Sequence, residues 1–122
     1  MIFRLKTTKY TSDKLKQLQS TTNITPNILS RIAVSLSLNQ EEVPEIPKAE
    51  AGGLDFNRNT LTGEFDYIYK AMITQHAERE ISDNEFFPDL FNAHLERGIR
   101  LLSNEYQHAG NIDKFLTNLF DN

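Results

Sequence analysis

The sequence predicts a mainly α-helical fold in which a short N-terminal β-strand precedes a compact helical domain. Apolar residues recur every three or four positions over most of the chain, whereas strict alternation is confined to the first few residues. The chain has 122 residues, of which 39% are hydrophobic, and this suffices for one domain with a single modest core. We divide this single domain into a strand-helix-helix head (residues 1–38), an acidic linker (39–63) and a helical body (64–122).

The predicted strand covers residues 1–7. Phe3 and Leu5 fall on one side of an extended segment, and the other side carries Ile2, Arg4 and Lys6. A strand this short needs a partner, and no second strand follows within hairpin distance. We therefore expect it to pair with the same strand of another subunit, antiparallel across a two-fold axis.

Two helices are expected to complete the head. Thr11 or Ser12 can cap the first, and Thr25 before Pro26 starts the second, which runs to about Leu38. The apolar positions of the two helices are Leu15, Leu18, Ile28, Leu29, Ile32, Ala33 and Leu36.

The linker is predicted to be irregular because prolines and glycines interrupt it. Its glutamates could compete with an anionic ligand for the head, although such a stretch is more often just a solvated connection.

The body is expected to contain three helices. Uninterrupted helical spacing predicts a third core helix over residues 64–81. Pro88 suits the first turn of the next, long helix. Within that long helix Gly98 permits close approach of another helix. Gly110 ends that helix, and Asn111 opens a last one whose apolar side should dock on the core or on a neighbouring subunit.

Charge is divided unevenly along the chain. The head carries six Lys or Arg against one acid, a net +5, while the rest carries seven against sixteen, a net −9. A basic end of this kind indicates contact with nucleic acid or an acidic surface, and the alternative is that the lysines merely keep the helices solvated.

Composition excludes several classes of protein. Cysteine is absent, so disulfides, thiolate catalysis and iron–sulfur ligation by this chain are excluded. Neither a membrane-spanning segment nor a signal peptide is evident, which predicts a soluble protein compatible with the cytoplasm and without a membrane partner.

Little in the sequence points to catalysis. The three histidines, His76, His94 and His108, lack metal-ligand spacing and are better interpreted as structural. Glu64 and Asp66 superficially resemble nuclease acids, but they lie on a predicted helix instead of adjoining strands. Without a nucleophile, base and orienting group, the chain is interpreted as a non-enzyme that needs no cofactor or metal.

The order strand, helix, capped turn, helix resembles the ribbon-helix-helix module of bacterial DNA-binding proteins, through FRLK, SDKLKQLQ and TPNILSRIAVSLSL. By that resemblance Ile2, Arg4 and Lys6 would face the major groove, and the amides opened by Thr25 and Asn27 would meet a phosphate. The alternative is that the strand only joins a dimer.

The stretches MIFRLKTTKYTSDKLKQLQS, TTNITPNILSRIAVSLSL and LFNAHLERGIRLL together resemble the DndE family of the bacterial DNA phosphorothioation system. The resemblance implies a small accessory subunit, tetrameric in the family, that binds double-stranded DNA with a preference for nicks through surface lysines. It also implies three kinds of partner: a cysteine desulfurase, an iron–sulfur ATP-pyrophosphatase-like protein and an ATPase. The candidate DNA-binding residues are Arg4, Lys6, Lys9, Lys14, Lys16, Thr25, Asn27 and Arg31.

Among these candidates we favour phosphate contact by Lys6, Lys9, Lys14 and Lys16 over base reading by the strand. Two other functions stay open. One is a protein–protein scaffold within the modification complex, and the other is a metal-dependent hydrolase acting at Glu64, Asp66 or the histidines.

Overall fold

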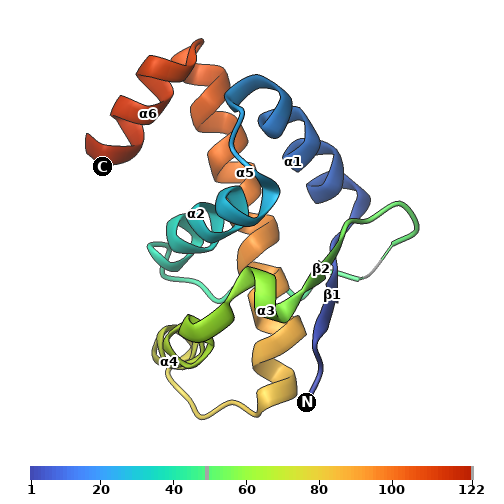
Figure 1. Cartoon of the computed structure of the whole chain (residues 1–122). Helices are drawn as coiled ribbons and strands as arrows, with labels where there is room; N and C mark the ends of the chain where they lie inside the picture. The colour runs from blue at the N-terminus through green and yellow to red at the C-terminus, as the bar shows by residue number, and fades with distance from the viewer. Residues whose placement is uncertain (49, 122) are drawn as a thin grey trace.

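A computed structural model describes residues 1–48 and 50–121 and has the predicted mainly helical architecture (Figure 1). In chain order the elements are β1 (Arg4–Lys6), α1 (Lys9–Thr22), α2 (Pro26–Leu38), β2 (Asp55–Asn57), α3 (Arg58–Leu61), the 3-10 turn η1 (Gly63–Phe65), α4 (Asp66–Ala77), the turn η2 (Glu85–Leu90), α5 (Phe91–Ala109) and α6 (Ile112–Asp121). The strand-helix-helix order of the head is confirmed.

Helix α5 runs through the centre of the molecule, and α1 and α2 both pack against it (Figure 1). The crossing with α2 is close at Gly98, where a Cβ atom would lie 1.8 Å from the carbonyl oxygen of Ala33. No side chain fits there, so the predicted close approach at Gly98 is confirmed. Large buried side chains fill the core around this crossing, among them Leu29, Leu95 and Ile99.

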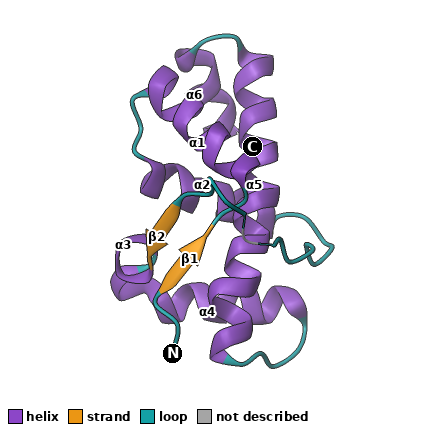
Figure 2. Cartoon of the chain, turned by 90° about the vertical axis from the view of Figure 1, so that its right-hand side faces the viewer, coloured by secondary structure: helices purple, strands orange, loops and turns teal. Residues whose placement is uncertain are grey.

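The pairing of β1 corrects the sequence-based expectation. Its partner is β2 of the same chain, antiparallel, with Leu5 opposite Phe56, instead of the same strand of another subunit. Both apolar residues are buried, while Arg4 and Lys6 are exposed on the other side of β1. Figure 2 shows the two strands side by side on the flank of the helices. The expectation failed because it considered only partners within hairpin distance.

The linker is accordingly more ordered than predicted. Its end contains β2 and α3, which anchor it to the core through Phe56 and Leu61. The three residues of β2 alternate polar, apolar and polar, a pattern too short to stand out in the sequence.

The helix starts differ in detail from those predicted. Helix α1 begins one turn early, because Thr8 is its N-cap and the Thr8 hydroxyl oxygen accepts a hydrogen bond from the Thr11 amide at 3.2 Å. Thr25 occupies the N-cap of α2 as expected, but its hydroxyl makes no capping hydrogen bond, and Pro26 supplies the start signal. The predicted end of α2 at Leu38 is confirmed.

Helix α4 is shorter and more exposed than the expected core helix over residues 64–81. Ile73 is its one fully buried residue, whereas Tyr67 and Met72 face solvent. The long helix begins at Phe91, after the η2 turn that contains Pro88. The last helix is present as predicted, and the Asn111 side chain accepts a hydrogen bond from its first turn at 2.9 Å. Within the described residues no helix is long and apolar enough to cross a membrane.

Candidate nucleic-acid interface

The basic residues of α1 lie on two flanks of the helix. Lys9 and Lys16 are two helical turns apart and therefore share one flank, where the Lys9 side chain lies close to Gly52 of the linker. Lys14 lies on the other flank with Tyr10, one turn before it. Lys9 and Lys16 are exposed, whereas Lys14 is half-buried.

Tyr10 links this second flank to α5. The Lys14 ammonium lies 5.8 Å and the Arg100 guanidinium 4.7 Å from the centre of the Tyr10 ring. A cation close to an aromatic ring is attracted by the negative face of the ring, which helps to hold two like charges near one another. Arg100 belongs to the acidic body of the chain, and no local pattern in the sequence groups it with the lysines of the head.

Two acids moderate the charge of Arg100. Glu96 lies one turn away at 3.6 Å and also accepts a hydrogen bond from the Thr8 hydroxyl at 3.1 Å. Glu45 of the linker lines the same shallow groove as Arg97 and Arg100, a hollow of about 340 Å³. The Arg100 side chain is nevertheless 58% exposed and able to contact a ligand from solvent.

The basic residues of β1 occupy a separate place. Arg4 and Lys6 are exposed, and Lys6 borders a groove of about 150 Å³ lined by the linker, η2 and α5. The Lys6 backbone carbonyl accepts a hydrogen bond from the Asn92 amide at 3.0 Å, which fixes the strand against α5. The Ile2 carbonyl accepts from Arg58 at 3.0 Å, so the backbone before β1 is also held.

The three candidates on α2 differ in how far they are free to bind a ligand. Thr25 is exposed and Asn27 half-buried at the helix N-terminus. Arg31, in contrast, donates to the carbonyl oxygens of Thr60 and Leu61 at 2.7 and 2.8 Å. Arg31 therefore fastens α3 to α2, and its guanidinium is partly occupied by this structural role.

Sequence reasoning missed the most heavily bonded side chain of the described residues, Arg58. Its guanidinium donates to both oxygens of Asp66 and both oxygens of Asp83 at 2.7–3.0 Å, and to the Ile2 carbonyl. It is 3% exposed and lies 5.2 and 4.9 Å from the ring centres of Phe86 and Phe87. The partners lie 8 and 25 positions away, so no local pattern signals this cluster.

The Arg58 hydrogen bonds lower the pKa of both Asp66 and Asp83 below the ordinary aspartate value, and the two carboxylates raise the pKa of Arg58 in turn. Asp66 is thus committed to a structural ion pair. This arrangement gives no support to the hydrolase hypothesis that used Asp66 as a free acid.

Two of the three histidines also have structural surroundings. His94 is buried, and burial lowers its pKa to about 3, so the ring is neutral at physiological pH. Its Nδ1 atom lies 2.8 Å from the Ser37 hydroxyl, which in turn accepts a hydrogen bond from Arg97. His76 packs edge-on against His94 with ring centres 4.8 Å apart. Among the residues described, no group of three His, Cys, Asp or Glu side chains is placed to hold a metal ion.

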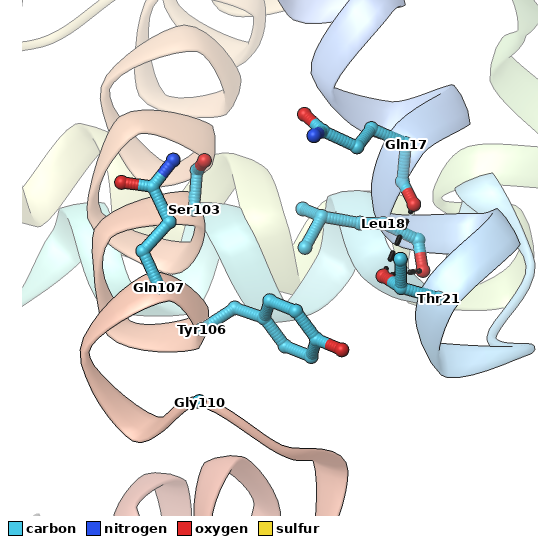
Figure 3. A pocket seen from close by; sticks show the side chains of 7 residues that line it. All are labelled: Gln17, Leu18, Thr21, Ser103, Tyr106, Gln107 and Gly110. Atoms are coloured by element: carbon cyan, nitrogen blue, oxygen red, sulfur yellow. Dashed lines mark hydrogen bonds between the residues drawn. The ribbon is translucent and has the colours of Figure 1, made fainter.

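A hollow of about 270 Å³ lies between α1 and the end of α5 (Figure 3). It is lined by Gln17, Leu18, Thr21, Ser103, Tyr106, Gln107 and Gly110. The lining side chains offer hydroxyl and amide groups but no charge. The Thr21 hydroxyl donates to backbone carbonyl oxygens of its own helix. Gln17 and Gln107 contribute the two side-chain amides of the hollow.

Together, the fold and the surface define a small, mainly helical protein that carries an exposed cluster of basic side chains on α1 and α5. The family DNA sulphur modification protein DndE matches residues 4–110, and the chain belongs to this family. DndE is an accessory protein of the phosphorothioation system, and membership supports a role in DNA phosphorothioation.

Solved structures agree with this assignment. The chain is similar to DndE from Escherichia coli B7A, involved in DNA phosphorothioation modification, with 26% identity, 81% of this chain and 96% of that chain covered, and a TM-score of 0.64. It is also similar to a G21/24K mutant of DndE, with 28% identity, coverage of 85% and 99%, and a TM-score of 0.66. No curated protein matches the chain.

Proposed function

We propose that this protein is a non-catalytic accessory subunit of DNA phosphorothioate modification that binds double-stranded DNA, preferentially at nicks, through surface lysines. The observation that carries the proposal is the exposure of Lys6 on β1 and of Lys9 and Lys16 on α1. Lys14 is half-buried on the other flank of α1. Lysines recognise phosphate as point charges and need no base contact, and phosphate contacts supply most non-specific affinity for DNA.

A preference for nicks is consistent with this kind of surface. A nick makes the duplex locally more flexible, so its phosphates can adjust to cations on separate parts of a protein surface at a smaller cost in bending energy. The proposed assembly is a cytoplasmic homotetramer, which would bring several basic heads to one DNA segment. Its partners would be the cysteine desulfurase, the iron–sulfur ATP-pyrophosphatase-like protein and the ATPase of the system.

Charge reversal in α1 tests the proposal. Lys14→Glu with Lys16→Glu should weaken binding to nicked duplex and reduce the slope of log affinity against log salt by about 1.8, since each phosphate contact contributes about 0.9. Lys114→Glu, at an exposed position of α6, is the matched control and should leave the slope unchanged. Binding by the parent protein that does not depend on salt would contradict the proposal.

A scaffold function is the second candidate, and the exposed apolar side of α4 favours it. Phe65, Tyr67, Ile68 and Met72 lie there at 38–72% exposure, more apolar surface than a helix facing only water requires. A scaffold would capture the other subunits without DNA, and Tyr67→Ser with Met72→Ser should abolish that capture. Capture that requires DNA would instead support the first candidate.

A further inference from the structure

We propose that the seam between α1 and α5 is a binding site for the backbone of one DNA strand, with a phosphate at Lys14 and Arg100 and the adjoining nucleotide in the hollow lined by Gln17 and Gln107. The proposal rests on the proposed DNA-binding function. It extends that function to a residue of the acidic body and to an uncharged surface, neither of which the basic head would suggest.

The two parts of the seam are adjacent on both helices. On α1, Tyr10, Lys14, Gln17 and Thr21 follow one another at spacings of three or four, so they line one side of the helix. On α5, Arg100 is followed by Ser103 and Gln107 at the same spacings. The Tyr10–Arg100 contact at 4.7 Å brings these two rows together. The cationic end and the amide-lined hollow are therefore about one helical turn, or roughly 5.4 Å, apart.

The chemistry of the two parts is complementary to a nucleotide. Lys14 and Arg100 are both attracted to the Tyr10 ring, and an anion placed between them would relieve their mutual repulsion. Gln17 and Gln107 each offer an amide N–H donor and a carbonyl acceptor, which suit a sugar oxygen or a base edge. Tyr10 is a positioning residue, because it holds the two cations without itself being required to touch the DNA.

The two parts of the site predict different salt signatures, and this makes the proposal testable with the full-length protein and a nicked duplex. Arg100→Gln should reduce the slope of log affinity against log salt by about 0.9. Gln17→Leu with Gln107→Leu should lower affinity about tenfold at every salt concentration, with the slope unchanged, because the lost hydrogen bonds are to neutral groups.

Matched controls come from the α4 end of the molecule. Arg79 is 53% exposed and also ion-paired, so Arg79→Gln removes an equivalent charge away from the seam. Gln75→Leu does the same for an exposed amide. Neither control should alter affinity or slope. Tyr10→Leu should reproduce the loss caused by Arg100→Gln, whereas Tyr10→Phe, which keeps the ring, should not.

Each result bears on the proposal separately from the general DNA-binding function. If the parent protein binds DNA in a salt-dependent way but Arg100→Gln behaves like Arg79→Gln, the seam is not a binding site although the proposed function survives. If the double glutamine variant binds like Gln75→Leu, the assignment of a nucleotide to the hollow is overturned. If the parent protein's own binding is independent of salt, the proposed function fails first.

Discussion

Two arginines from outside the basic head, Arg58 and Arg100, show how the same side chain takes opposite roles in one small protein. Arg58 is 3% exposed, and two carboxylates and a backbone carbonyl accept hydrogen bonds from its guanidinium. Arg100 is 58% exposed, lies against the Tyr10 ring and has a single acidic partner at 3.6 Å. The first arginine has no donor left for a ligand, whereas the second has most of its donors free.

The difference shows that the number of partners matters more for function than the number of charges. Arg58 and its two aspartates join the start of β1 to α3, α4 and the segment before η2, so the cluster holds together segments far apart in the sequence. The Tyr10–Lys14–Arg100 cluster joins only α1 and α5, two helices that also pack against each other. Incomplete pairing at an exposed cationic cluster is what leaves capacity for an external anion.

Removal of the Arg58 side-chain charge should have the largest effect on stability. Arg58→Met keeps an apolar stem against Phe86 and Phe87 but leaves Asp66 and Asp83 without their shared partner. Removing one partner of a buried ion pair costs about 3 to 5 kcal/mol of unfolding free energy. Because both carboxylates are partly exposed, we expect a loss of about 3 kcal/mol, at the lower end of this range. Urea unfolding followed by circular dichroism measures it.

The control for this variant is Arg79→Met, which removes an exposed arginine paired with Glu85 at 2.8 Å. Its unfolding midpoint should stay close to that of the parent protein, since exposed ion pairs contribute little. An Arg58→Met midpoint no lower than the Arg79→Met midpoint would mean that the Arg58 cluster is not a structural anchor.

Low pH should also weaken the Arg58 cluster, with a smaller effect on stability than Arg58→Met. Asp66 and Asp83 have lowered pKa values in the folded state, so their stabilisation is complete above the ordinary aspartate pKa near 3.8 and is lost as pH falls through the folded values. The difference in unfolding free energy between the parent protein and Arg58→Met should be constant above about pH 5 and shrink below about pH 4.

The experiment compares two proteins because protonation of His94 also makes the stability depend on pH. The pKa of His94 is lowered to about 3, so between about pH 6.5 and 3 the unfolded chain binds a proton that the folded protein does not. The free energy of unfolding therefore decreases as the pH decreases through that window. Arg58→Met retains His94, so this contribution cancels in the difference. A difference that stays constant down to pH 3 would show that the Asp66 and Asp83 carboxylates are not stabilised by Arg58.

The sequence predicted much of the fold because its strongest signals are local. Helical spacing located α2, α4 and α5, and Gly98 correctly marked a close helix crossing. The pairing of β1 with β2 and the Arg58 cluster could not be predicted, because each joins residues far apart in the chain and is decided by packing. The exposure of α4 had the same cause: an apolar stripe shows that a helix can be buried, but not whether a neighbour covers it.

The candidate site was likewise predictable where its signal is local and unpredictable where it depends on packing. The lysines of the head were visible as a local excess of charge, and the structure shows most of them exposed. Arg100 pairs with Glu96 at i, i+4, which is a local contact. Its contact with Tyr10, 90 positions earlier, depends on how α1 packs on α5.

Arg100→Gln should have the smallest effect on stability of the variants considered. The substitution removes one exposed charge, a single 3.6 Å ion pair and the contact of the guanidinium with the Tyr10 ring. Exposed substitutions of this kind change the free energy of unfolding by about 0.5 kcal/mol or less. Thermal unfolding of Arg100→Gln should therefore match that of the parent protein within a few degrees while DNA affinity falls. A destabilisation comparable to that of Arg58→Met would mean that Arg100 is a second structural anchor, and the contrast between the two arginines would fail.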